Sequence, residues 1–138
     1  MTTAESQDLH TVAVTHLGDD RFDVAVRGHR ITVDQPLDAG GTDTAPTPTE
    51  LFVASLAACV AFYARRYLRR HELPTEGLAV DATYEMGTRP SRVTGITVTV
   101  TVPAGVPDER RDALLAVASH CTVHNSLEEA PAVSVVLS

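Results

Sequence analysis

The chain has 138 residues, of which 43% are hydrophobic and 21% charged, and its formal net charge is −7. This length suffices for one domain with a sizeable core and is too short for two full-sized domains. The acidic balance argues against a general binder of nucleic acid or of anionic membranes, because those surfaces would repel it. All 11 basic residues are Arg, so chemistry that needs a lysine amine, such as Schiff-base formation, is excluded.

The first residues lack the basic-then-apolar order of a secretion signal. The longest apolar stretch, 51–64, is too short to cross a bilayer. We therefore expect a cytoplasmic protein with no membrane partner. In a reducing compartment Cys59 and Cys121 are expected to be thiols, which leaves reactive, metal-binding and inert roles open.

We expect a single domain over residues 1–138, with residues 1–8 frayed. Apolar and polar residues alternate over 12–14, 22–26 and 31–33, and glycine-containing turns separate these segments. The alternation predicts three antiparallel strands in a meander. The next segment, 35–46, holds two Gly and two Pro and is predicted to be a loop.

A long helix is predicted to begin after Thr47, which suits the N-cap, with Pro48 in the first turn and Glu50 three residues after the cap. It extends to about His71. Residues 51–64 are apolar on all sides, whereas the last turns carry four Arg. The pattern predicts a helix whose first half is buried and whose end lies in water.

Two strands are predicted next, over 78–86 and 96–102, each with apolar residues on one face. A helix is expected from Pro107 towards His120, a short turn or helix near Cys121, and a last strand over 133–137. Strands that occur in runs indicate an α+β fold with antiparallel sheets, in the order β-β-β-α-β-β-α-β. So few strands cannot enclose an all-apolar helix, so we expect a homodimer whose sheets enclose two central helices.

Two segments of the sequence match a known family. Pro48-Thr49-Glu50-Leu51 leads to Ala57-Ala58-Cys59, and Cys121-Thr122-Val123-His124 follows some sixty residues later. The chain resembles the OsmC/Ohr family of osmotically inducible and organic-hydroperoxide-resistance proteins, as a divergent branch. The resemblance covers nearly the whole chain from the second strand onward, and it agrees with the order of elements given above.

The resemblance implies a thiol-dependent peroxidase. Cys59 would attack an organic hydroperoxide and become a sulfenic acid, Cys121 would condense with it to a disulfide, and a dithiol of the lipoyl type would reduce that disulfide. It also implies an intertwined homodimer with the cysteines at the subunit interface, and no bound cofactor.

An arginine and a glutamate activate the first cysteine in the peroxidase branches of this family. The family's glutamate position is occupied here by Thr49. Glu50 lies nine residues before Cys59, on the opposite side of the helix and about 13.5 Å along its axis. Glu50 is thus expected either to complete a capping box with Thr47 or to orient an arginine. The candidates are Arg21, Arg27 and Arg30, of which Arg21 lies nearest to the family position.

Local electrostatics favour the other cysteine as the nucleophile. Cys59 lies too deep in its helix for the helix dipole to act on it, whereas Cys121 is predicted to begin a helical turn beside His120. The family order names Cys59, and we follow the family order.

Several alternatives remain open. Cys121, His120 and His124, with Cys59, could bind zinc, although we expect no metal. Arg66 could bind an acidic ligand, while the cluster of Arg65, Arg66, Arg69 and Arg70 most simply forms a solvated face. An apolar pocket lined by Leu56, Phe62 and Tyr63 could hold a peroxide or, in a non-catalytic stress protein, another apolar ligand. The cysteines could also be inert core residues.

Overall fold

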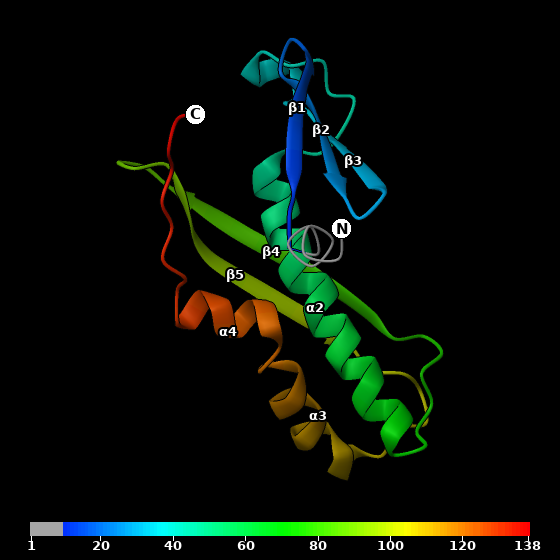
Figure 1. The fold of residues 1–138 in the computed structure, drawn as a ribbon. Helices are drawn as coiled ribbons and strands as arrows, with labels where there is room; N and C mark the ends of the chain where they lie inside the picture. Colours follow the sequence, from blue (N-terminus) through cyan, green and yellow to red (C-terminus); the bar gives the residue numbers. More distant parts are fainter. Residues whose placement is uncertain (1–9) are drawn as a thin grey trace, which may run out of the picture. The chain divides into compact units, whose positions relative to one another are not determined.

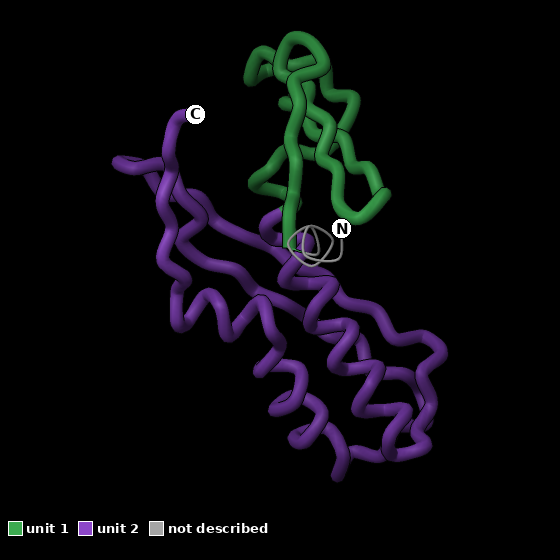
Figure 2. Tube along the Cα trace, viewed as in Figure 1, with its two compact units in different colours: residues 1–51 green, residues 52–138 purple. Residues whose placement is uncertain are grey.

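The computed structural model describes residues 10–138, so the frayed start predicted over residues 1–8 lies outside the described residues. Contacts group the chain into two compact units, one ending at Leu51 and the other spanning Phe52–Ser138 (Figure 2). Each unit is described by itself, and the prediction of a single domain stays a prediction. The α+β class with antiparallel sheets and a long helix is confirmed (Figure 1).

The first unit is built on a three-stranded antiparallel sheet in the order β1-β2-β3, as predicted. The strands are β1 (Ala13–Gly18), β2 (Arg21–Val26) and β3 (His29–Val33). The β2–β3 turn places Arg27 and Gly28 at positive φ, 49° and 87°, as a tight two-residue hairpin turn requires.

One face of this sheet is apolar because the register aligns apolar residues across all three strands. Val24 lies opposite both Val14 and Ile31, and Phe22 lies opposite Val33. The side chains of Val14 and Ile31 are nevertheless 59% and 44% exposed. This face is therefore an apolar surface that a single chain leaves largely open to solvent.

The predicted loop after β3 is organised by a buried carboxylate. Asp34 is fully buried and accepts hydrogen bonds from the hydroxyls of Thr42 and Thr44, both at 2.7 Å. The backbone amides of Gln35 and Thr44 donate to it as well, at 2.7 and 3.0 Å. These bonds favour the ionised form and hold the pKa of Asp34 well below its ordinary value. The loop also contains a short 3-10 helix, η1 (Leu37–Ala39).

The long helix is α2 (Pro48–Arg70), and it begins with the predicted capping box. The amide of Glu50 donates to the hydroxyl of Thr47 at 3.0 Å, and the amide of Thr47 donates to the Glu50 carboxylate at 2.9 Å. Two otherwise unpaired amides of the first turn are thereby satisfied.

The second unit packs helices on one face of a hairpin (Figure 1). The elements after α2 are β4 (Ala79–Gly87), β5 (Arg92–Thr101), η2 (Asp108–Arg110), α3 (Arg111–Ala118) and α4 (Thr122–Glu128). The apolar face predicted for the second strand and the first part of that predicted for the first strand pack against the helices. Tyr84 and Met86, at the end of the first strand, are exposed. The core joins Leu56, Val60 and Leu68 of α2 to Leu114 and Ala118 of α3.

The burial of α2 differs from the prediction. Only one face is buried, while Phe52 and Phe62 on other faces are 41% and 57% exposed. The last turns are not simply in water, because Tyr67 and Leu68 pack into the core. Two arginines precede this apolar pair and two follow it in the sequence, so composition alone predicts a polar end of the helix. By length and hydropathy alone α2 could cross a membrane, a property that core helices share.

The last predicted strand is wrong for the single chain. Residues 130–138 form no helix or strand, and Val133, Val135 and Leu137 are 81%, 90% and 98% exposed. A strand needs a hydrogen-bonded neighbour, and no described strand pairs with this segment. The segment therefore has the alternating sequence pattern of a strand but is not paired with a strand of the described chain.

Candidate functional site

Cys121 lies where α3 gives way to α4, and it is the N-cap residue of α4. Its sulfur accepts a hydrogen bond from the backbone amide of His124, at 3.4 Å. The side chain is completely buried among the apolar residues of the second unit. The cysteine therefore takes the place that Ser, Thr or Asp usually occupies at a helix start.

Cys59 lies in the middle of α2 and meets Cys121 across the packing of the two helices. The Cys59 side chain packs against the core cluster that contains Cys121 and is close enough to influence its pKa, and both residues are free thiols. Cys59 is half-buried and packs against the core, so its sulfur lies nearer to solvent than that of Cys121. The fold thus brings together two thiols that are 62 positions apart in the sequence.

Burial raises the pKa of the Cys121 thiol. The amide of His124 acts in the opposite direction, but the Cys59 side chain raises this pKa further, because two neighbouring sulfurs do not readily both carry a negative charge. The raised pKa of Cys121 counts against the expectation from local electrostatics that it is the nucleophile, and the choice between the two cysteines stays a prediction. His120 does not help it, since the ring Nδ1 of His120 bonds the carbonyl of Ala116 at 2.7 Å.

A second bond between α2 and α4 lies beside the thiols. The hydroxyl of Tyr63, one turn after Cys59, bonds the hydroxyl of Thr122 at 2.8 Å. The guanidinium carbon of Arg66 lies 4.8 Å from the centre of the Tyr63 ring, which is a cation–π contact. The sequence did not predict that Thr122 bonds Tyr63. The available signal was its position directly after Cys121, which places a hydroxyl at the start of α4.

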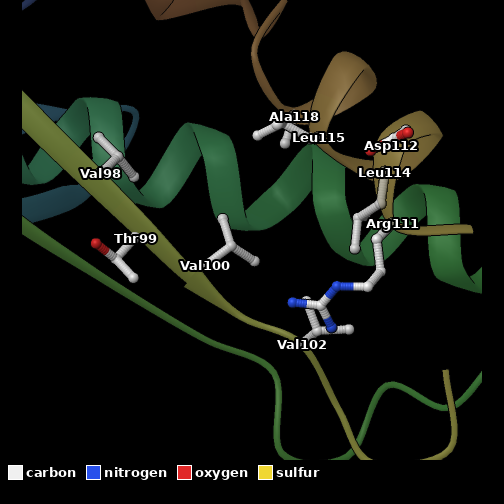
Figure 3. A pocket seen from close by; sticks show the side chains of 9 residues that line it. All are labelled: Val98, Thr99, Val100, Val102, Arg111, Asp112, Leu114, Leu115 and Ala118. Atoms are coloured by element: carbon white, nitrogen blue, oxygen red, sulfur yellow. The ribbon is translucent and has the colours of Figure 1, made fainter. Parts of the chain in front are cut away.

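Two apolar cavities adjoin this part of the second unit. One of about 340 Å³ lies between β5 and α3, with the side chains of Val98, Val100 and Leu115 on its walls and Arg111 at its end (Figure 3). The other, of about 230 Å³, shares those three walls and is closed by Leu56 of α2. Together they form an apolar groove along β5 that reaches the helix segment carrying Cys59.

Comparison with known proteins identifies the family. A profile of OsmC-like proteins matches residues 41–136, which is more than half of the chain. The chain belongs to the OsmC-like protein family. No curated protein matches the sequence.

Solved structures agree with this assignment. A Psychrobacter arcticus protein, provisionally described as an osmotic stress induced and detoxification response protein, is 28% identical, with a TM-score of 0.78 over 84% of this chain and 86% of the other. An OsmC-like protein of Mycoplasma pneumoniae is 17% identical, with a TM-score of 0.75 over 87% of each chain. An organic hydroperoxide resistance protein of Elizabethkingia anophelis is 22% identical, with a TM-score of 0.68 over 88% and 91%. The last two show the shared fold.

The two residues expected to activate the thiol in this OsmC-like protein belong to the first unit. The Glu50 carboxylate is engaged in the capping box of α2, as the alternative reading of this residue expected. Arg21 begins β2 and is half-buried, facing Gly18 across the turn. Their catalytic roles stay predictions.

The three residues predicted to line one ligand pocket do not line a common cavity. Leu56 closes the smaller cavity, whereas Phe62 lies along a hollow bordered by the arginines at the end of α2. Tyr63 is tied to Thr122. Six steps of 100° place Phe62 about 120° from Leu56 around the helix. Seven steps bring Tyr63 back to within about 20° of Leu56 but about two turns further along α2.

The side chains considered for zinc are engaged separately. His120 bonds the Ala116 carbonyl, and His124 pairs with the Glu128 carboxylate at 3.5 Å, one turn along α4. Among residues 10–138, no three His, Cys, Asp or Glu side chains converge on one point.

Proposed function

We propose that this OsmC-like protein is a peroxidase that reduces organic hydroperoxides with Cys59 and Cys121. The observation that carries the proposal is the proximity of the two free thiols, which lie far apart in the sequence and pack in the same part of the core. Relatives of the same fold from Legionella pneumophila and Elizabethkingia anophelis are named organic hydroperoxide resistance proteins, and this name supports the choice of substrate.

The reaction proceeds in three balanced steps. The Cys59 thiolate attacks the distal oxygen of the hydroperoxide, the O–O bond breaks, and the alkoxide leaves as an alcohol after taking a proton. The sulfenic acid on Cys59 then condenses with the Cys121 thiol, which forms the S–S bond and releases water. A dithiol of the lipoyl type finally reduces the disulfide by thiol–disulfide exchange and is itself oxidised. The chain needs no bound cofactor for these steps.

Burial supports the assignment of the two roles. The attacking sulfur must reach peroxide as a thiolate, and Cys59 is only half-buried. Cys121 is completely buried with a raised pKa, so it suits the second step, in which it reacts with a neighbouring sulfenic acid. A buried resolving thiol is also protected from direct attack by peroxide.

The proposal requires a cation near Cys59. The largest influences on the neighbouring Cys121 pKa are burial, two backbone amides and Cys59 itself, and none of them is a cation. We infer that a homodimer completes the site and that its arginine comes from the first unit, with Arg21 as the first candidate. Glu50 remains a candidate to orient that arginine only if its carboxylate leaves the capping box.

The organic part of the substrate fits the apolar groove along β5. Its walls carry Val98, Val100, Leu115 and, next to α2, Leu56. Such walls favour an alkyl or aryl group and offer nothing to hydrogen peroxide. A cytoplasmic location would keep the thiols reduced between turnovers.

The decisive experiment adds one equivalent of cumene hydroperoxide to the reduced protein, followed by thiol titration and peptide mass spectrometry. We expect both thiols to be consumed and a Cys59–Cys121 disulfide to form. Cys59→Ser should abolish peroxide consumption, whereas Cys121→Ser should stop at a Cys59 sulfenic acid that dimedone traps. Thiols that survive excess peroxide would overturn the proposal and leave an inert stress protein.

A second function, non-catalytic binding of an apolar ligand, is favoured by the same groove. Its two cavities of about 340 and 230 Å³ are lined mainly by aliphatic side chains. This function predicts that a fatty acid raises the melting temperature of Cys59→Ser, in which the peroxidase is disabled. An unchanged melting temperature would exclude it.

A further inference from the structure

The last two turns of α2 carry an unusual density of positive charge. Arg65, Arg66, Arg69 and Arg70 are all exposed, and residues 51–71 contain no Asp or Glu. The spacing gives two rows of like charges one turn apart, which destabilise a helix. The four arginines form a positively charged patch on a chain whose net charge is −7.

No carboxylate of the described chain neutralises these arginines. The two ion pairs recorded among residues 10–138, Arg30 with Asp23 and His124 with Glu128, lie elsewhere. Glu50, the nearest acidic residue before the patch, is engaged in the capping box at the far end of α2. The positive charge is therefore available to an external anion.

The patch is hollowed and partly fixed in shape. The four guanidinium groups and the ring of Phe62 border a depression of about 320 Å³. Arg66 is held over two aromatic rings, with its guanidinium carbon 5.4 Å from the centre of Phe62 and 4.8 Å from that of Tyr63. Such contacts reduce the conformational freedom that an arginine loses on binding a ligand.

We propose that this arginine hollow is a binding site for a compact anion that carries two or more phosphate groups. Guanidinium groups bind phosphate oxygens through paired hydrogen bonds, and several charges on one ligand can meet several arginines together. A bound anion would also relieve the repulsion between the two rows. The site does not use the thiol chemistry, so it stands independently of the proposed peroxidase.

The test is calorimetric titration of the reduced full-length protein with inorganic pyrophosphate and, separately, with orthophosphate. We expect one pyrophosphate per chain, bound at least about tenfold more tightly than orthophosphate, since tenfold corresponds to roughly one charge-assisted hydrogen bond. Binding should weaken as salt is raised, because the patch is exposed. No detectable binding, or equal affinity for the two anions, would overturn the proposal.

A pair of double variants locates the site. Arg65→Gln with Arg69→Gln should weaken pyrophosphate binding by about tenfold or more, because it removes one row of charge. Arg89→Gln with Arg92→Gln removes the same charge at the exposed turn between β4 and β5 and should leave the affinity within about twofold. Equal losses in both variants would mean a general charge effect and would overturn the assignment. Circular dichroism and the peroxide reaction, expected to be unchanged in both, check that the fold is intact.

Discussion

Tyr63 and Thr122 form the only direct hydroxyl–hydroxyl contact recorded between α2 and α4 in the described chain, and it lies next to both thiols. The bond holds the start of α4, and with it Cys121, against the helix that carries Cys59. We expect Tyr63→Phe to slow disulfide formation about fivefold, since a hydrogen bond contributes about 1 kcal/mol. Stopped-flow measurement of the second step after a peroxide pulse checks this.

The matched control is Tyr84→Phe, which removes a hydroxyl from a half-exposed ring on β4. It should leave the rate of disulfide formation unchanged. Thr122→Val combined with Tyr63→Phe should be no slower than either single variant, because the two share one bond. Additive losses would show that the hydroxyls act separately.

Asp34 makes the stability of the first unit depend on pH. Its pKa is lowered in the fold from an ordinary value of 3.8, so the unfolded chain binds a proton at a higher pH than the folded chain does. The stabilisation is thus fully present above pH 3.8 and is lost as the pH falls below it towards the folded pKa. We expect the contribution of Asp34 to the urea midpoint to stay constant from neutral pH down to pH 3.8 and to fall below that pH.

Asp34→Asn supplies the comparison for this pH dependence. The variant should unfold at lower urea at neutral pH, because an amide cannot accept the hydrogen bonds that Thr42 and Thr44 donate as well as a carboxylate does. Its midpoint should also change less with pH than that of the unaltered protein. Parallel pH profiles for the two proteins would show that the carboxylate does not stabilise the loop.

Residue chemistry was predictable only where it depended on near neighbours in the sequence. The pairing of Thr47 with Glu50 needs only a spacing of three. The raised pKa of Cys121 depends on burial beneath α2 and on contact with Cys59, and neither can be read from the residues beside it. For the same reason His120, adjacent in sequence, proved to bond the Ala116 carbonyl.

At the scale of the element, the start of α2 separates two roles of Glu50. Gln can replace Glu in a capping box but carries no charge to orient an arginine. We expect Glu50→Gln to retain both thermal stability and peroxide turnover, and Glu50→Ala to lose about 1 kcal/mol of stability. Thermal unfolding and an assay with cumene hydroperoxide measure both effects.

A stable Glu50→Gln variant whose turnover falls more than about tenfold, equivalent to roughly 1.4 kcal/mol of barrier, would restore the catalytic role. Thr47→Ala is the control, because it breaks the other bond of the same box and leaves the Glu50 charge in place. Thr47→Ala should lose as much stability as Glu50→Ala does. Its peroxide turnover should equal that of the unaltered protein. This pattern distinguishes a capping residue from one that activates the thiol.

Elements were predictable where the pattern and the partner lie in one chain. Strands β4 and β5 alternate and pair with each other, and their apolar faces cover α2 as expected. The end of α2 was harder, because Leu68 is fully buried between arginines that dominate the composition of that turn. Periodicity identified the strand-like pattern at 133–137, but no described strand of the chain pairs with this segment.

At the scale of the whole molecule, two apolar surfaces of the chain lack cover. They are the sheet face with Val14 and Ile31 and the extended segment with Val133 and Val135. Exposed apolar surface of this extent is typical of a protein that associates. The predicted homodimer would explain both, and it is also what the proposed thiol activation requires.

The extended segment provides the test of that dimer. Val133 and Val135 lie on one side of an extended chain and Ser134 and Ser138 on the other. If the segment joins a partner's sheet with its apolar side inward, Val133→Asp with Val135→Asp should convert the dimer to a monomer in sedimentation analysis. Ser134→Asp with Ser138→Asp adds the same charge on the opposite side and should leave the dimer intact. A dimer that survives the first pair, or is lost equally in both, would show that this segment does not hold the subunits together.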